Sequence, residues 1–116
     1  MAARAPIVAF NVELAAPANL ERAKRIARAI REPGRLAAIG VALASREHTA
    51  QVSMNVEDPY GLPLAAIVEA ISRHADVSAA EIVGLAPRAA LAGFPDGLAI
   101  RGFDPARQII ENHLDW

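Results

Sequence analysis

Three neutral polar side chains alternate with apolar ones along residues 50–57 of this 116-residue sequence. The polar positions are Gln51, Ser53 and Asn55, and the apolar positions are Val52, Met54 and Val56. Strict alternation predicts a half-buried β-strand whose polar residues share one face. Amide side chains and hydroxyls both donate and accept hydrogen bonds, so this face suits a polar ligand or a second polar surface. An ordinary hydrated sheet face is the alternative interpretation.

A second alternating segment, residues 6–14, repeats the pattern. Its predicted core face is Val8, Phe10, Val12 and Leu14, and its opposite face is Ile7, Ala9, Asn11 and Glu13. Because Phe10 belongs in the core, Asn11 must point away from it. If both strands lie in one sheet, Asn11 projects beside Gln51, Ser53 and Asn55, next to the small Ala9. We predict that this face of the sheet carries the function.

The rest of the sequence supplies the elements that would hold these strands. In chain order we predict a helix from Asn19, its N-cap, to about Arg31, and then a strand over 36–45. After the strand over 50–57 we predict a helix from Pro63 to about Ala75, a short strand over 82–85 with Glu81 at its start, and a helical turn over 88–91. A final helix opens at Asp104 and Pro105 and turns Ile109, Ile110 and Leu114 inward. The order βαββαβ plus a terminal helix predicts an α+β fold, a ferredoxin-like sandwich with both main helices on one face of an antiparallel sheet.

The strand over 36–45 is interpreted with Ile39, Val41 and Leu43 on the core face. The opposite face would then carry Gly40, Ala42 and Ala44, which are nearly bare and permit close approach of a ligand or a second sheet. Together with Ile7 and Ala9, this face would be too apolar to remain in water. We therefore expect a second layer to cover it, either another chain or a second copy, and we predict a homodimer or a higher even-numbered assembly.

Composition narrows the class of protein. We expect residues 1–116 to form a single domain. The net charge of −1, without a basic stripe interleaved with aromatics, argues against nucleic-acid binding. No apolar run approaches the roughly 20 residues of a membrane span. The absence of cysteine is compatible with a cytoplasmic location, and neither a metal-ligand pattern nor a phosphate-binding glycine loop is present.

Four motifs in order resemble those of the C-terminal subdomain of glutamate formiminotransferase. They lie at residues 9–12, 25–32, 50–55 and 81–87, and residues 109–111 resemble the end of that subdomain. The resemblance implies transfer of a formimino group from formiminoglutamate to tetrahydrofolate in histidine degradation, a part of one-carbon metabolism. It also implies two α/β subdomains whose sheets face each other around the folate. Asn11, Gln51, Ser53, Asn55 and Glu81 are the folate-binding candidates that follow.

The sequence departs from the family where catalysis would occur. The family's N-terminal subdomain, which holds the catalytic histidine, has no counterpart here, and the connection near Arg35 is short. His48, His74 and His113 fall outside the motifs, so we assign no catalytic residue. Arg35 and Arg88 lie nearest to the motifs and could pair with a carboxylate, although surface roles remain open.

Two hypotheses remain. The chain is a folate-binding half-site that transfers a formimino group only with an N-terminal-type subdomain, or it is a non-catalytic, self-associating binding domain. No metal is expected in either case.

Overall fold

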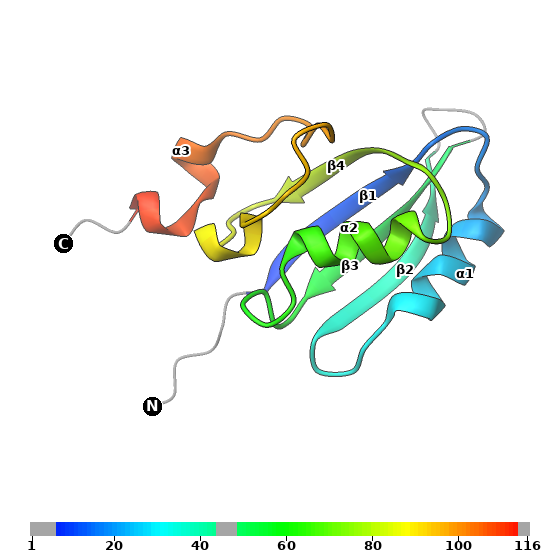
Figure 1. Cartoon of the computed structure of the whole chain (residues 1–116), viewed down its shortest axis with the longest axis horizontal. Helices are drawn as coiled ribbons and strands as arrows, with labels where there is room; N and C mark the ends of the chain where they lie inside the picture. Colours follow the sequence, from blue (N-terminus) through cyan, green and yellow to red (C-terminus); the bar gives the residue numbers. More distant parts are fainter. Residues whose placement is uncertain (1–6, 44–48, 114–116) are drawn as a thin grey trace.

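Four antiparallel strands form one sheet in the order β2-β3-β1-β4 (Figure 1). The structure is a computed structural model that describes residues 7–43 and 49–113. The strands are β1 Val8–Leu14, β2 Leu36–Ala42, β3 Ala50–Val56 and β4 Val77–Val83. With the helices α1 Leu20–Ile30 and α2 Leu64–Ser72 between them, the order is βαββαβ. The predicted ferredoxin-like fold is confirmed.

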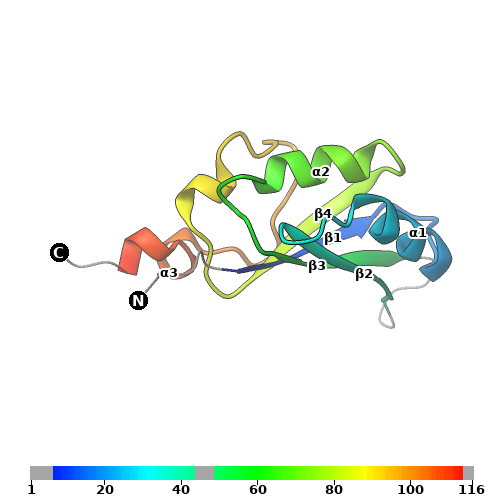
Figure 2. The ribbon, with the colours of Figure 1, turned by 90° about the horizontal axis from the view of Figure 1, so that it is seen from below.

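Both main helices cover the same face of the sheet, and the other face is left open (Figure 2). Helix α1 begins where predicted, because the side-chain oxygen of Asn19 accepts a hydrogen bond of 2.9 Å from the backbone N–H of Arg22. It ends at Ile30, one residue before the expected end. Helix α2 is shorter than predicted and ends at Ser72, with Pro63 as its N-cap residue.

The core lies between the sheet and these two helices. The predicted inward faces of β1 and β3 are confirmed: Phe10, Val12, Val52 and Val56 are fully buried, and Met54 is nearly so. Helix α2 contributes Leu64, Ile67 and Ile71 to the same cluster. Because the inward residues of two adjacent strands are fixed, their alternate residues must face away from the helices.

The predicted faces of β2 are wrong. Leu36 and Ala38 are buried against the helices, whereas Ile39 is 62% exposed on the open face. Gly40 explains the reversal, since a Cβ atom there would lie 2.3 Å from the backbone nitrogen of Lys24 in α1. The small residues of β2 thus admit α1 rather than a ligand. Ala42 lies on the same face of β2 as Ala38 and Gly40, because alternate residues of a strand share a face. Ala44 lies outside the described residues.

The chain after β4 wraps along the free edge of that strand. β4 itself begins earlier than predicted, at Val77, and includes Glu81. Residues 98–101, here called the strap, pair with it: the N–H of Ala80 donates to Ala99 O and the N–H of Arg101 donates to Ala80 O, both at 2.8 Å. The predicted turn over 88–91 is confirmed as a 3-10 helix.

The predicted final helix is divided into two short pieces. Asp104 caps the first, Pro105–Gln108, by accepting a hydrogen bond of 3.1 Å from Ala106 N–H. Ile109 then leaves the helical conformation, and a 3-10 turn spans Ile110–His113. Ile109 is buried and Ile110 partly so, while Leu114 falls outside the described residues.

Candidate functional site

The polar side chains singled out in the sequence lie together on the open face of the sheet. Strand register places them in cross-strand rows. The rows are Val41–Gln51–Glu13–Ala79, then Ile39–Ser53–Asn11–Glu81, then Ala37–Asn55–Ala9–Val83. We call these residues, with Ile7, the open face. Side chains directly opposite each other on one face are within contact distance, so the five predicted residues form one polar surface.

Asn11 and Glu81 are joined across β1 and β4. The side-chain amide of Asn11 donates to Glu81 Oε1 at 2.9 Å. This bond orients the amide so that its own oxygen is directed elsewhere, as an acceptor. Glu81 is exposed and Asn11 is half-buried. The pair therefore offers a carboxylate acceptor and an amide acceptor side by side, which matches a ligand edge that carries several N–H donors.

Glu13 and Arg101 form an ion pair at the adjacent row. Arg101 Nη2 lies 2.9 Å from Glu13 Oε2, with 11% of the Glu13 side chain and 51% of the Arg101 side chain exposed. Arg101 belongs to the strap, so its side chain reaches across β4 to β1. Glu13 is the one buried charged residue among those described, and Arg101 partly neutralises it. About half of the Arg101 side chain remains exposed at the surface of the open face.

A shallow pocket of about 300 Å³ lies over this ion pair. Its wall includes Asn11, Glu13, Gln51, Glu81 and Arg101, with Leu43 and two alanines of β4. A smaller pocket of about 140 Å³ lies toward β2, beside Ser53 and Asn55. The five predicted residues therefore line two neighbouring hollows of one face, and ligand-sized clefts with a few convergent polar groups are typical binding sites.

Apolar side chains surround the polar rows. Ile7, Ile39 and Val83 are each more than half exposed on the open face. The prediction that this face is partly apolar is therefore correct for Ile7 and Ala9, but Ile39 and Val41 take the places assigned to Gly40 and Ala42. Large apolar side chains exposed on one sheet face favour the expectation that another layer covers that face.

Both candidate arginines have structural roles. Arg35 contacts Glu32 at 3.2 Å, Asp58 at 3.3 Å and the carbonyl oxygen of Gly61, and thereby ties the start of β2 to the loop before α2. Its hydrogen bond to Glu32 is the main reason that the pKa of Arg35 is raised. Arg88 donates to Asn112 Oδ1 at 2.8 Å, away from the open face. Neither arginine lines the pocket.

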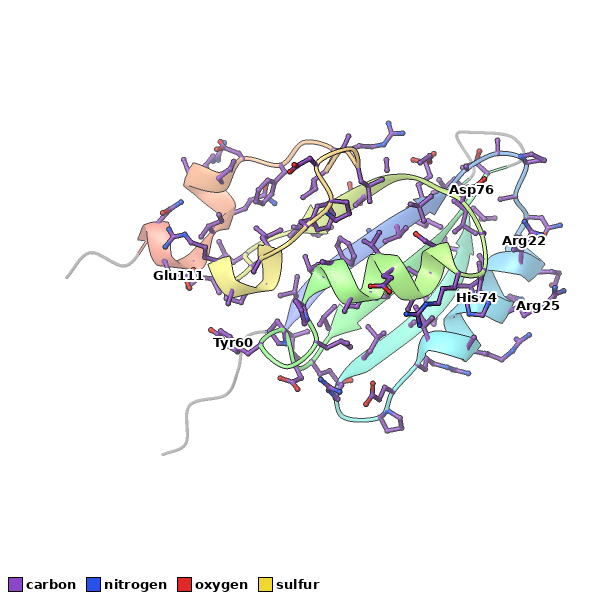
Figure 3. All side chains as sticks on the ribbon, in the orientation of Figure 1. Arg22, Arg25, Tyr60, His74, Asp76 and Glu111 are labelled. Atoms are coloured by element: carbon purple, nitrogen blue, oxygen red, sulfur yellow. The ribbon has the colours of Figure 1, made fainter. Side chains whose placement is uncertain are left out.

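Glu111 fastens the C-terminal turn to the 3-10 helix at Arg88. Its Oε1 accepts a hydrogen bond of 2.8 Å from the backbone N–H of Arg88. That bond is the main reason that the pKa of Glu111 lies below its ordinary value. Figure 3 places Glu111 at the C-terminal end of the described chain, on the side of the molecule away from α1.

The histidines do not assemble a site in the described part of the chain. His74 is exposed and follows α2, in the layer of helices (Figure 3). His48 and the side chain of His113 lie outside what the structure describes. Among the residues of 7–43 and 49–113, no histidine lines the pocket over Glu13 and Arg101. Sequence reasoning and structure thus leave the acid/base group of a transfer reaction unassigned in this chain.

Two participants in the pocket escaped the sequence reasoning. Glu13 is on the predicted face, but it occupies an outward position of an alternating strand, as an ordinary surface carboxylate would. Nothing in the sequence therefore indicated that it is buried. Arg101 is 88 positions away along the chain (101 − 13 = 88) and no local pattern links the two. Only the pairing of the strap with β4 brings them together.

Other kinds of site find no support in the described residues. Across 7–43 and 49–113, no group of three or more His, Cys, Asp or Glu side chains could hold a metal ion. None of the helices in the same ranges is long and apolar enough to cross a membrane.

The fold and the open face define an α+β domain with one uncovered, partly polar face of its sheet. Comparison with protein families identifies the group more closely: the formiminotransferase domain matches residues 9–94. This chain therefore belongs to the formiminotransferase domain family. Comparison with curated proteins found no match. Asn11, Gln51, Ser53, Asn55 and Glu81 lie within the matched residues, whereas Arg101 lies beyond them.

Proposed function

We propose that this chain binds a folate-type ligand on its open face and forms half of a formiminotransferase site. An N-terminal-type subdomain would supply the other half and the acid/base group. The observation that carries the proposal is the polar surface of Asn11, Gln51, Ser53, Asn55 and Glu81. These residues line the two neighbouring pockets and lie within the family-matched region. Residues 1–116 would act as one domain resembling the family's C-terminal subdomain, in the cytoplasm, within histidine degradation and one-carbon metabolism.

The chemistry of the ligand fits this surface. A reduced pterin presents an amino group and ring N–H groups next to a carbonyl oxygen. Glu81, fixed by Asn11, can accept from such donors, and Gln51 or Ser53 can serve the carbonyl. The amine of the ligand must attack the amidine carbon of formiminoglutamate and lose a proton, while glutamate takes one up as it leaves. That transfer needs a group with a pKa near neutrality, which we assign to the N-terminal-type subdomain.

Titration of the chain with 5-formyltetrahydrofolate by calorimetry tests the binding. We expect Asn11→Ala and Glu81→Gln each to weaken binding roughly tenfold, because a hydrogen bond to a charged acceptor is lost. Glu69→Gln is the matched control, since Glu69 is an exposed carboxylate of α2 that pairs with Arg73. Binding that is absent in the wild type, or equally weakened by Glu69→Gln, would disprove a folate site on the open face.

Activity gives a second test. The isolated chain should not convert formiminoglutamate and tetrahydrofolate, because no histidine of the described residues lines the pocket. Turnover at a typical enzymatic rate, on the order of 1 to 10³ per second, by the chain alone would refute the assignment of that group to another subdomain.

The exposed apolar residues of the open face favour a second candidate, a non-catalytic binding domain that associates with itself. In that case a second copy covers Ile7, Ile39 and Val83 as a homodimer. Ile39→Arg should dissociate such a dimer in light scattering, since a charge would enter a largely dry contact. Ser72→Arg, on α2, is the control. A wild-type chain that stays monomeric at micromolar concentrations would exclude this candidate.

A further inference from the structure

Strand β2 forms one edge of the sheet, and its outward backbone groups can be assigned. Leu43 N–H donates to Thr49 O and Glu57 N–H donates to Arg35 O, so odd-numbered residues of β2 turn their backbone groups toward β3. Alternation in an antiparallel pair then directs the groups of Ala38, Gly40 and Ala42 outward. No bond from these groups to another described segment is present.

The same edge already accepts an antiparallel partner at its first residue. Leu36 N–H donates to Glu32 O at 2.8 Å, and Glu32 N–H donates to Leu36 O at 3.0 Å. Beyond Leu36 the edge is regular and consists of small and apolar residues, without the lysine, proline or bulge that usually blocks pairing. Ala38 is only 4% exposed, so the accessible template for an added strand consists of the outward groups of Gly40 and Ala42.

Basic side chains border this open stretch. Lys24, Arg28 and Arg31 lie on one side of α1 and line a hollow of about 210 Å³ together with Ala38, Ile39 and Gly40. All three are exposed, and the carboxylate nearest to Lys24, that of Glu21, is 4.0 Å away. Figure 1 shows α1 running alongside β2 at the edge of the molecule. Cationic groups thus stand over the place that an added strand would occupy.

We propose that the β2 edge binds an extended acidic segment of a partner protein by adding it as a further strand. Backbone hydrogen bonds would form with Gly40 and Ala42, and alternate acidic residues would meet Lys24, Arg28 and Arg31. The intervening residues would lie on the other side, beside Ile39, and should be apolar. This is the known mode of recognition by strand addition, with specificity set by alternate side chains.

Charge complementarity selects this occupant over a second copy of the chain. Pairing of two β2 edges about a two-fold axis would place two α1 helices side by side, with Lys24, Arg28 and Arg31 of each facing the other. Like charges that are brought together in this way oppose association. An acidic strand gains from the same cluster, with an affinity that falls as salt is added.

The test uses a blocked peptide in which Glu and Val alternate over seven residues, titrated into isotopically labelled chain. We expect the amide resonances of Gly40 and Ala42 to shift most. Two control peptides separate the contributions: the same peptide with Lys in place of Glu, and a Glu/Val peptide methylated on alternate backbone nitrogens. Both should bind at least tenfold more weakly, because the first loses charge attraction and the second loses backbone pairing.

Variants of the chain complete the test. Arg28→Glu with Arg31→Glu should weaken binding roughly tenfold, because two exposed ion pairs become repulsions. Arg22→Glu is the matched control: Arg22, labelled in Figure 3, lines a different hollow with Pro17 and Asn19 and should change binding by less than about twofold. Ala42→Pro removes an outward N–H and should also weaken binding, whereas Ala42→Val keeps it and should not.

Several results would overturn the proposal. These are equal binding of the Glu and Lys peptides, undiminished binding of the methylated peptide, an equal effect of Arg22→Glu, and shifts confined to the open face. A wild-type dimer that dissociates with Ala42→Pro but not with Ala42→Val would show that a second copy occupies the edge instead.

Discussion

Replacing Gly40 by alanine tests the packing of α1 on β2 with a single methyl group. The added Cβ would lie 2.3 Å from Lys24 N, 2.6 Å from the carbonyl carbon of Ala23 and 2.8 Å from Lys24 Cα. All three are backbone atoms, so no side chain can rotate away. Ordinary contact requires at least 3.4 Å, and α1 must therefore move by roughly 1 Å.

That displacement has a predictable cost. A gap of about 0.5–1 Å forfeits a quarter to a half of the dispersion attraction between the facing surfaces. The residues of α1 that lose contact are Ala23, Ile26 and Ala27, all buried. Overpacking of this kind costs about 1–3 kcal/mol. The gain in chain stiffness from Gly to Ala, about 0.4–1 kcal/mol, offsets only part of it.

The assay is urea denaturation followed by far-ultraviolet circular dichroism. We expect Gly40→Ala to lower the free energy of unfolding by about 1–2 kcal/mol after the offset. Gly97→Ala is the control, because its Cβ would meet nothing within 4 Å and its backbone needs no positive φ. That variant should match the wild type or be slightly more stable. A Gly40→Ala chain as stable as Gly97→Ala would refute the close approach of α1. It would instead favour the opposite orientation of β2, with Ile39 and Val41 facing the helices.

Three further predictions follow from the two faces of the sheet and from the C-terminal contacts. Val52→Ala, fully buried, should lower the free energy of unfolding by about 1–3 kcal/mol, whereas Gln51→Ala on the open face should cost about 1 kcal/mol or less, as measured in urea; a reversed ranking would contradict the assigned faces. Arg101→Gln should lower the thermal midpoint more than Arg25→Gln does, because the buried carboxylate of Glu13 loses the guanidinium; equal midpoints would refute a stabilising pair. Because the pKa of Glu111 is lowered in the folded protein, its contribution to stability is present above its ordinary value of 4.5 and is lost as pH falls through the lower folded value. Glu111→Gln should therefore reduce the pH dependence of the free energy of unfolding on the acid side. An unchanged slope of that free energy below pH 4.5 would contradict this.

The sequence was informative wherever a strand had one strongly apolar and one strongly polar face. In β1 and β3 the alternation of Phe10 with Asn11, or of Val52 with Ser53, permitted only one choice of the buried face. In β2 both faces carry apolar or small residues, so residue size was the only criterion for choosing the buried face. The large residues were therefore assigned to the core. The structure reverses them because α1 approaches so closely that only Ala38 and Gly40 fit beneath it.

The C-terminal region was predictable only in its local signals. Asp104 does cap a helix, as its position before Pro105 indicated. The helix is nevertheless short, because Ile110 N–H donates to Ala86 O at 2.9 Å and so draws the chain into pairing beside β4. Tertiary pairing of this kind, which also places Arg101 over Glu13, leaves no periodic trace in the sequence.

The open face and the β2 edge meet at Ile39. It lines the hollow beside Lys24 and also the smaller pocket beside Ser53 and Asn55, and it is 62% exposed. A strand added at the edge would place its apolar residues next to Ile39, and so would extend the row that continues through Ser53, Asn11 and Glu81. Occupation of the edge would then widen the surface available to a covering layer. The pocket over Glu13 and Arg101 is lined mainly by residues of β1, β4 and the strap, but Leu43, which directly follows Ala42, also lines it. A strand added at the edge would therefore reach the pocket at Leu43, and binding there should leave the affinity of the pocket for its ligand unchanged or raise it.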